Sequence, residues 1–141
     1  MEQNDYTIIG RREWVNFADF SLSGIEAKID TGAYTSSIHC HHIQADGNRV
    51  KCVFLDPEHE KYTGEELTFD IFKSVKVRSS NGQQEERYMI KTFIEVLGKS
   101  YPIRLTLTDR SNMNYPILIG RRFLRGKFLV DVTQIHQSTE V

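Results

Sequence analysis

The sequence is short of cysteine and proline, has almost no surplus charge of either sign, and contains no long apolar run. Its 141 residues include two Cys and three Pro, with 18 Lys plus Arg against 19 Asp plus Glu. The formal net charge of −1 argues against a protein that coats nucleic acid, which needs an excess of cations. The longest apolar run has four residues, Cys52–Leu55, so we expect no membrane span.

These shortages also indicate a location and a size class. The chain starts with a polar, acidic segment, Met1–Asp5, which lacks the features of a secretory signal. Cys40 and Cys52 are therefore expected to be reduced thiols in the cytoplasm. An apolar fraction of 39% is sufficient for a core, and the length predicts one soluble domain over residues 1–141.

Short runs in which apolar and polar residues alternate are the main pattern that is present. The apolar members of these runs are Ile25/Ala27/Ile29, Leu67/Phe69/Ile71, Val75/Val77, Tyr88/Ile90, Ile103/Leu105/Leu107 and Phe128/Val130/Val132. A period of two is typical of strands with one buried face. We therefore predict an all-β fold, a small closed antiparallel barrel of the kind formed by short strands.

The turn-forming residues between these runs also support this fold. Asn81-Gly82 and Gly98-Lys99 predict hairpin turns, because such pairs tolerate positive φ angles. The three prolines, Pro57, Pro102 and Pro116, are expected at strand margins, where a missing amide proton does no harm. Only Arg121–Arg125, which lies between two glycines, predicts a helical turn. The barrel should thus carry one short helix near the C-terminus.

The tetrapeptide Asp30-Thr31-Gly32-Ala33 directly follows the alternating strand that ends at Ile29. A strand that leads into such a turn can hold a carboxylate rigidly, since Gly32 lets backbone amides approach and the Thr31 hydroxyl can lock the turn. The tripeptide alone favours an Asp30 that only caps the turn through an Asx hydrogen bond. Its context is an apolar strand that ends in Gly120-Arg121 and precedes the short helix.

The order of these motifs resembles the retroviral-type aspartic peptidases. It is more closely similar to the bacterial and archaeal retropepsin-like family labelled RimK-associated or "ATP-dependent zinc protease". The resemblance covers about Ile8–Val132 and is carried by Ala27–Ala33, Thr35–His39, Val77–Gly82, Glu86–Ile90, Leu107–Met113 and Tyr115–Arg122. With these additional motifs, the catalytic interpretation of Asp30 becomes the favoured one.

The resemblance implies an aspartic endopeptidase that holds a water between two aspartates, one ionised and one protonated. Since the chain has one Asp-Thr-Gly, this implies a homodimer with one Asp30 from each copy. Thr31 would link the two active-site turns, and Gly32 would direct its amide at the dyad. The mechanism needs no cofactor. Relatives lie beside ATP-grasp ligases that add glutamates to protein tails, which suggests a protein or peptide substrate with acidic or glutamate-modified tails.

Further residues of the resemblance are candidates for substrate binding. Lys28 shares a strand face with Asp30 by alternation, so it would favour the ionised aspartate or anchor an acidic substrate; a solvated lysine is the alternative. Ala33 completes the turn. The hairpin around Gly82 lies where a flap over the substrate belongs, although an ordinary exposed hairpin fits the same residues. Three arginines would bind substrate carboxylates through bidentate contacts: Arg78, Arg87 and Arg110.

One position departs from the viral pattern. Viral relatives place an acid just after Asp-Thr-Gly-Ala, where it pairs with the arginine that follows the apolar-apolar-Gly element. Tyr34 occupies that position here. We therefore expect Arg121 to find Asp109, Asp131 or solvent instead.

The run His39-Cys40-His41-His42 is the one cluster of metal-ligand residue types. On a strand, His39 and His41 would share one face and Cys40 and His42 the other, giving at most two ligands per side. A catalytic zinc needs three protein ligands, so we expect no metal. Two alternatives to the aspartic peptidase remain at this stage: a non-catalytic β-barrel module that binds peptides without turnover, and a zinc-dependent peptidase.

Overall fold

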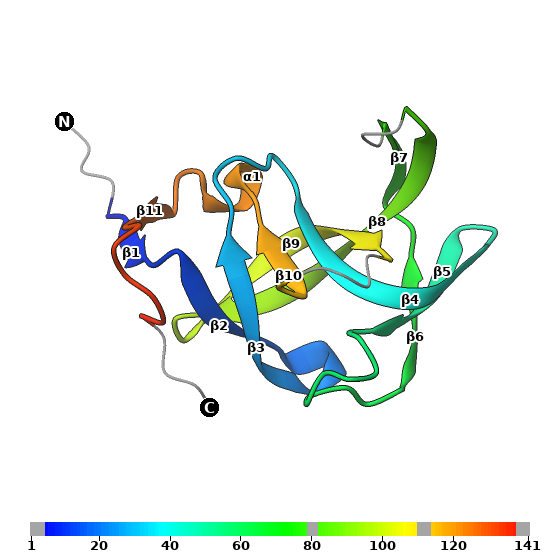
Figure 1. Cartoon of the computed structure of the whole chain (residues 1–141), viewed down its shortest axis with the longest axis horizontal. Helices are drawn as coiled ribbons and strands as arrows, with labels where there is room; N and C mark the ends of the chain where they lie inside the picture. The colour runs from blue at the N-terminus through cyan, green and yellow to red at the C-terminus, as the bar shows by residue number, and fades with distance from the viewer. Residues whose placement is uncertain (1–4, 79–81, 110–113, 138–141) are drawn as a thin grey trace.

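The computed structural model describes residues 5–78, 82–109 and 114–137. Over these residues the fold is almost entirely β, with one 3-10 turn and one short α-helix (Figure 1). The elements in chain order are β1 (Thr7–Ile9), β2 (Arg12–Phe17), η1 (Ala18–Phe20), β3 (Leu22–Ile29), β4 (Ser36–Asp46), β5 (Arg49–Phe54), β6 (Glu66–Asp70), β7 (Lys73–Arg78), β8 (Gln84–Val96), β9 (Lys99–Thr108), β10 (Ile117–Ile119), α1 (Arg121–Leu124) and β11 (Phe128–Val130).

A closed barrel of six strands forms the body of the described structure, which confirms the predicted fold class. The strands pair in the order β10-β3-β2-β8-β9-β4, and β4 closes the ring by pairing with β10. The helix α1 directly follows β10, as the two flanking glycines predicted. Two pairings in the ring, β10 with β3 and β4 with β9, are parallel. Local alternation could not show this, because parallel pairing joins segments that lie far apart in the sequence.

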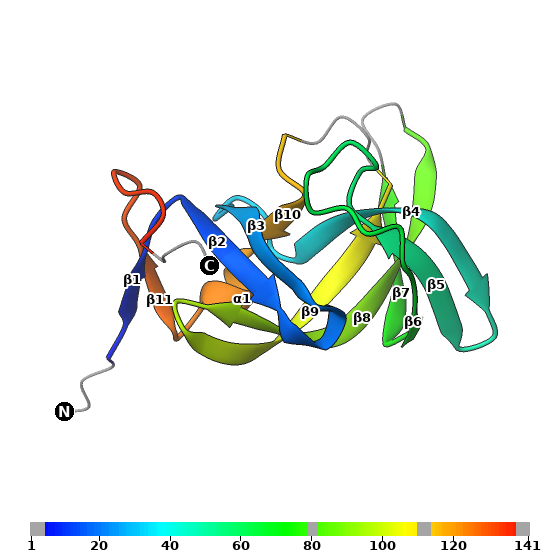
Figure 2. The same cartoon turned by 90° about the horizontal axis from the view of Figure 1, so that it is seen from below.

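Two pairs of strands extend from the barrel. Strand β7 pairs with the first half of β8, and β5 pairs with both β4 and β6. Both views show these strands on the side away from β1 and β11 (Figures 1 and 2). The predicted hairpin around Asn81-Gly82 is thus confirmed by the register of β7 and β8, with Gly82 at φ 85°. Asn81 itself lies outside the described residues.

The barrel interior is filled by apolar side chains that alternate with polar ones along its strands. Fully buried side chains include Phe17, Ile25, Ile38, Ile90 and Leu105. Because successive residues of a strand point to opposite faces, these positions leave their neighbours on the outer surface. The predicted runs identified the core positions of β3, β8 and β9, but Phe17 and Ile38 were in none of them, and Val132, a member of the last run, is 67% exposed.

Strands β8 and β9 form the longest hairpin. Its turn is Leu97-Gly98, with φ angles of 52° and 81°, as a two-residue turn between twisted strands requires. One prediction for this region is wrong: Pro102 lies within β9, opposite Phe93, and not at a strand margin. The proline is tolerated there because β4 pairs with β9 only from Leu105 onward, so the other edge of β9 needs no amide proton at residue 102.

The segment after β11 runs back along the start of β2. It forms three backbone hydrogen bonds there, from Asp131 N–H to the Ile9 carbonyl, from Arg11 N–H to the Gln134 carbonyl, and from His136 N–H to the Arg12 carbonyl. Glu13 is fully buried and accepts the N–H groups of Gly10 at 2.8 Å and Gln137 at 3.1 Å. The Glu13 carboxylate thus links Gly10, near the start of the described chain, to Gln137 at its end.

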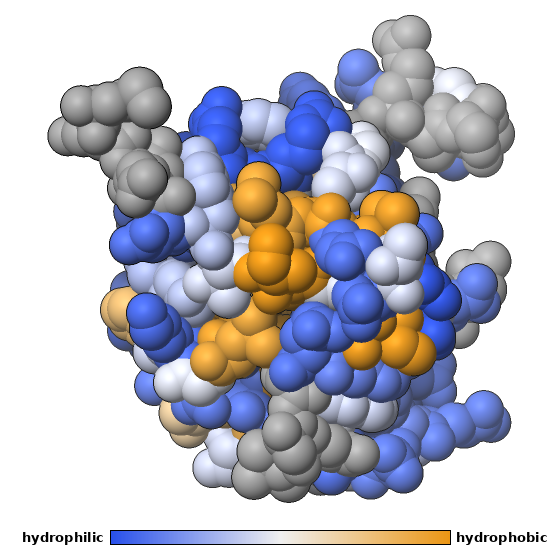
Figure 3. Space-filling model, turned by 90° about the vertical axis from the view of Figure 1, so that its left-hand side faces the viewer, coloured by the Kyte–Doolittle hydropathy of each residue, from blue (hydrophilic) through white to orange (hydrophobic). Residues whose placement is uncertain are grey.

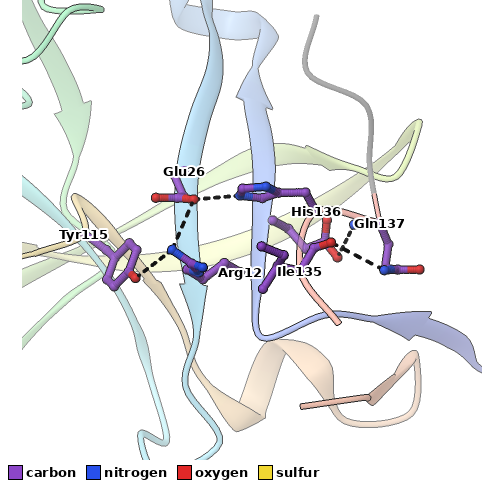
Figure 4. A network of polar contacts seen from close by, with 7 residues as sticks. Arg12, Glu26, Tyr115, Ile135, His136 and Gln137 are labelled. Atoms are coloured by element: carbon purple, nitrogen blue, oxygen red, sulfur yellow. Dashed lines mark hydrogen bonds and ion pairs between the residues drawn. The ribbon is translucent and has the colours of Figure 1, made fainter. Parts of the chain in front are cut away.

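Side chains of β2 and β3 hold the same segment (Figure 4). The Glu26 carboxylate lies 2.6 Å from the His136 ring and 4.0 Å from Arg12, and Arg12 also donates to the Tyr115 hydroxyl at 3.3 Å. The His136 ring stacks on Trp14 with 4.5 Å between centroids.

No helix among the described residues is long and apolar enough to cross a membrane.

Candidate active site

Asp30 lies at the end of β3, in a turn that fixes one of its two carboxylate oxygens. The Asp30 N–H donates to the Ile119 carbonyl of β10 at 2.8 Å, and the Ala33 N–H donates to the Asp30 carbonyl at 3.1 Å. Gly32 N–H donates to Asp30 Oδ1 at 3.0 Å. A Cβ on Gly32 would lie 3.2 Å from that oxygen, so glycine allows the close approach. The side chain is half-buried, and no hydrogen bond to Oδ2 comes from the described residues.

The second motif supports this turn from the opposite side. Gly120 N–H donates to the Ser36 hydroxyl, and the N–H groups of Arg121 and Arg122 donate to the carbonyls of Ala33 and Tyr34 at 2.8 and 3.0 Å. The Gly120 backbone is extended, with φ −92° and ψ 175°. Glycine is required there because a Cβ would lie 2.6 Å from the Thr35 carbonyl oxygen. The start of α1 and the Asp30 turn therefore pack backbone against backbone.

Arg121 finds different partners from those expected. Its Nη1 donates to the Thr31 carbonyl at 2.9 Å, and its guanidinium lies 5.8 Å from the centroid of the Tyr34 ring. Of the three expected partners, Asp109 and Asp131 do not pair with it, while solvent does reach this exposed side chain. Tyr34 replaces the acid of the viral pattern as an aromatic partner, and the arginine still ties α1 to the Asp30 turn.

The other predicted site residues lie in three places. Ala33 is part of the Asp30 turn, and Lys28 is exposed on β3 opposite Arg12 and Leu118. Arg78 ends β7, Gly82 follows the hairpin turn, and Arg87 lies on β8 opposite Val75. Arg110 lies outside the described residues. The structure therefore brings Asp30, Thr31, Gly32 and Ala33 together and leaves Arg78, Gly82 and Arg87 on the extended hairpin of β7 and β8.

Arg87 is already engaged within its own strand. Its Nη2 lies 3.2 Å from the Glu85 carboxylate, and its Nε is buried with no hydrogen-bond partner among the described residues. A buried donor of this kind is costly to leave unpaired. The Glu85 contact and the buried Nε hold the Arg87 side chain against the hairpin.

The histidine cluster does not follow the simple alternation that was expected. The register of β4 and β5 shifts between His41 and Gln44, and His42 has a φ of 54°. His39 is buried, with Nε2 4.0 Å from Asp56, while His41 contacts the Tyr62 hydroxyl at 3.0 Å. In residues 5–78, 82–109 and 114–137, no three His, Cys, Asp or Glu side chains are grouped as a metal site requires.

Cys40 and Cys52 are buried neighbours on β4 and β5, and both are free thiols. The hydrogen bond between the two side chains, together with burial, raises the pKa of Cys40 far above its usual value of 9.0. A thiol in this state is protonated and unreactive at neutral pH. The pair therefore belongs to the core, not to a nucleophilic site.

Sequence reasoning missed Ser36 and a group of cations beside α1. Ser36 was part of a recognised motif, but its hydroxyl gains its role only when β10 packs against the start of β4. The cations Lys91, Arg104, Arg122 and Lys127 come from β8, β9, α1 and the turn after it. No local pattern could have grouped them.

The closed barrel and the braced Asp-Thr-Gly turn are features of a retropepsin-like domain. The family model described as "RimB-like: Retropepsin-like aspartic endopeptidase RimB" matches residues 8–139. The chain belongs to this family and has its peptidase fold.

Curated relatives carry a different name. The chain is 33% identical over 138 residues to a "Probable alpha-L-glutamate ligase" of Shewanella pealeana, covering 95% of this chain and 30% of that protein. A protein of the same name from Parasynechococcus marenigrum is 34% identical over 134 residues, covering 92% and 29%. The chain thus spans about a third of the length of these relatives.

A solved structure supports the fold alone. A Legionella pneumophila protein of unknown function, Lpg0085, superposes with a TM-score of 0.78 at 23% identity, covering 96% of this chain and 100% of that one.

Proposed function

We propose that this protein is an aspartic endopeptidase in which Asp30 from each of two copies activates a water. The observation that carries the proposal is the Asp30 turn, which holds Oδ1 through Gly32 and is braced by β10 and Arg121. A carboxylate held through Oδ1, whose Oδ2 accepts no hydrogen bond from the described part of the chain, suits a general base. The partner's carboxylate would keep its proton and donate it to the substrate carbonyl.

The second copy is needed because each chain has one Asp-Thr-Gly. A candidate surface for it lies around β1 and β11, where Figure 3 shows a gathering of apolar groups. Ile8 and Leu129 on these strands are 48% and 51% exposed, and Val132 and Ile135 follow at 67% and 38%. Within residues 5–78, 82–109 and 114–137, no other strand pairs with β1 or β11, and unpaired edges favour addition of a partner's strands. Sedimentation at micromolar concentration should show a dimer, and activity per chain should fall on dilution. Activity that stayed constant per chain would contradict the dimer.

The proposed substrate is an acidic or glutamate-modified protein tail. Support comes from the name of the curated relatives, alpha-L-glutamate ligase, since a protein that attaches glutamate suggests a matching hydrolase for its product. Arg78 and Arg87 on the hairpin of β7 and β8, with Lys28 and Arg110, are the proposed contacts to substrate carboxylates. We place this activity in the cytoplasm, where free thiols such as Cys40 and Cys52 persist.

A second candidate is a peptide-binding module without turnover. The hydrogen bond from Gly32 N–H to Asp30 Oδ1 favours it, because an Asx turn gives the aspartate a purely structural role. Replacing the Asp30 carboxylate with the uncharged amide of asparagine distinguishes the two candidates, because it should abolish cleavage by a peptidase but preserve peptide binding by a module.

The experiment is incubation with a glutamate-tailed peptide and a generic peptide, followed by mass spectrometry. We expect cleavage by the parent protein and none by Asp30→Asn, since the amide keeps the turn but cannot accept the proton of water. Asp109→Asn is the matched control, because Asp109 is exposed and lies outside the turn; it should lose less activity. Binding without cleavage by the parent protein would favour the module, and cleavage by Asp30→Asn would contradict the proposed mechanism.

A further inference from the structure

A cavity of about 500 Å³ lies on the outer face of the β8–β9 hairpin, beside α1. Lys91 and Phe93 line it from β8, on the strand face opposite the buried Ile90 and Ile94. Arg104 lines it from β9, directly across from Lys91. None of the residues of the Asp30-Thr31-Gly32-Ala33 turn lines this cavity, so it is distinct from the candidate active site.

The charge around this cavity has one sign. Four of its lining side chains are cations, Lys91, Arg104, Arg122 and Lys127, and none of the described lining residues is acidic. None of the four pairs with a carboxylate of the described residues, whereas Arg12, Arg49, Lys51 and Arg87 all do. In a chain of net charge −1, this is a local concentration of unneutralised positive charge.

The pairing of Lys91 with Arg104 makes that charge unfavourable in the absence of a ligand. Like charges directly opposite each other across two strands are destabilising. Both cations contact the Phe72 ring: its centroid lies 4.1 Å from Lys91 Nζ and 4.6 Å from the Arg104 guanidinium carbon. The ring attracts each cation but carries no net charge, so their mutual repulsion remains. An anion bound beside the pair would reduce this repulsion.

Lys127 adds a third cation, which is half-buried. Its Nζ donates to the Phe123 carbonyl at 2.7 Å and lies 4.7 Å from the centroid of the Phe123 ring. Burial lowers the pKa of this amine. A carboxylate in the cavity would stabilise its charged form.

The kind of anion follows from the rest of the lining. A compact phosphate site usually has backbone N–H groups converging on one point, but the first N–H groups of α1 are already bonded to Ala33 and Tyr34. Here the charges are carried by side chains of four elements, the Lys91–Arg104 pair together with Arg122 and Lys127, and the lining also includes Met89, Phe93 and Phe123. Carboxylates on methylene stems, spaced along a chain, match an alternation of cations and apolar surface.

We propose that this cavity binds an acidic peptide segment, with Lys91 and Arg104 as its principal carboxylate contacts. Arg122 N–H is bonded to the Tyr34 carbonyl, and Thr35 also lines the cavity. A peptide bound there therefore lies next to the Asp30 turn without occupying it. This site rests on the proposed function only in identifying the bound peptide as a substrate; binding itself requires no cleavage.

The test measures binding of a fluorescent hexaglutamate peptide by anisotropy, with Asp30→Asn as the parent so that no turnover occurs. We expect binding that weakens with salt, and a hexaglutamine peptide that does not bind. Lys91→Gln combined with Arg104→Gln should weaken hexaglutamate binding about tenfold or more, since each removes a charge-assisted contact. The matched control is Lys99→Gln, an exposed cation of β9 that does not line the cavity; it should bind as the parent does. Thermal melting checks that each variant is folded.

Unchanged binding by the double variant, or equal binding of hexaglutamine, would overturn the proposal. Displacement of the peptide by inorganic phosphate at equal concentration would identify a small-anion site and also overturn it. The double variant could bind hexaglutamate as the parent does and still cleave glutamate tails in an Asp30-dependent way. That result would reject this cavity as the binding site and leave the proposed peptidase activity standing. Binding at the cavity without any cleavage by the native protein would support this binding site and reject the proposed peptidase activity.

Discussion

Gly120 is the position where a single methyl group should do most damage to the Asp30 turn. An alanine Cβ would lie 2.6 Å from the Thr35 carbonyl oxygen and 2.8 Å from that of Tyr34, and real Cβ contacts are essentially never under 3.0 Å. Both obstacles are backbone atoms, so neither can rotate away. The two loops must therefore separate by at least the difference between 3.0 and 2.6 Å, about 0.4 Å.

That separation stretches the hydrogen bonds that join the loops. Those from Gly120, Arg121 and Arg122 now measure 3.0, 2.8 and 3.0 Å. If the separation halves three bonds of about 1 kcal/mol each, the loss of about 1.5 kcal/mol adds to overpacking of about 2 kcal/mol, the middle of the usual range, and the gross loss is about 3–4 kcal/mol. Reduced freedom of the unfolded chain offsets up to about 1 kcal/mol. We expect a net loss of about 2–3 kcal/mol in the free energy of unfolding.

The assay is thermal unfolding followed by circular dichroism. At about 2.1 cal/mol/K per residue, 141 residues give an unfolding entropy of about 0.3 kcal/mol/K, so Gly120→Ala should lower the Tm by about 7–10 °C. Gly47→Ala is the control: its φ of 61° strains an alanine, but no atom lies within 4 Å of the added Cβ. A cost of about 1 kcal/mol there predicts a loss of about 3 °C. Equal Tm values for the two variants would refute the close-packing argument.

Three further predictions concern chemistry. Peptidase activity should follow a bell-shaped pH profile, because one Asp30 must be ionised while its partner is protonated; a profile with a single limb would contradict a dyad. Treatment with a chelator should leave turnover intact, whereas loss of activity that zinc restores and His39→Ala abolishes would favour a zinc peptidase. The free energy of unfolding should fall as pH rises above 9.0, since the unfolded Cys40 thiol ionises there while burial and Cys52 raise the pKa of the folded one. Below that pH both states keep the proton. A Cys40→Ala variant should be less stable at neutral pH, because it loses a buried side chain, but its stability should fall less steeply above pH 9.0 in denaturant titrations.

Much of the barrel could be predicted because its information is local. Ile25, Ala27 and Ile29 alternate with polar residues, and the structure buries all three in β3. The glycines on either side of Arg121–Arg125 likewise placed α1 to within one residue. In both cases, the residues that determine the element are its own neighbours.

Contacts between distant segments could not be predicted in the same way. The Arg121 side chain reaches Thr31, 90 positions earlier in the chain, and nothing near either residue specifies the pairing. The parallel pairing of β10 with β3 could not be predicted either. Its register, with Ile119 opposite Ile29, depends on the closure of the whole barrel. The cavity cations likewise come together only after β8, β9 and α1 have packed.

The segment that runs back along β2 has a consequence for how the molecule opens. Arg11 donates its N–H to Gln134 and accepts the N–H of Ile29 at 2.8 Å, and Ile29 directly precedes Asp30. Releasing the C-terminal segment therefore removes the hydrogen bond that Arg11 N–H donates to Gln134, and Arg11 is the residue that holds Ile29 beside the Asp30 turn. In native-state hydrogen–deuterium exchange, the amides of Arg11, Ile29 and His136 should open with similar free energies, as one cooperative unit. The rigidity of the aspartate thus depends on a strip of chain more than 100 positions away in the sequence.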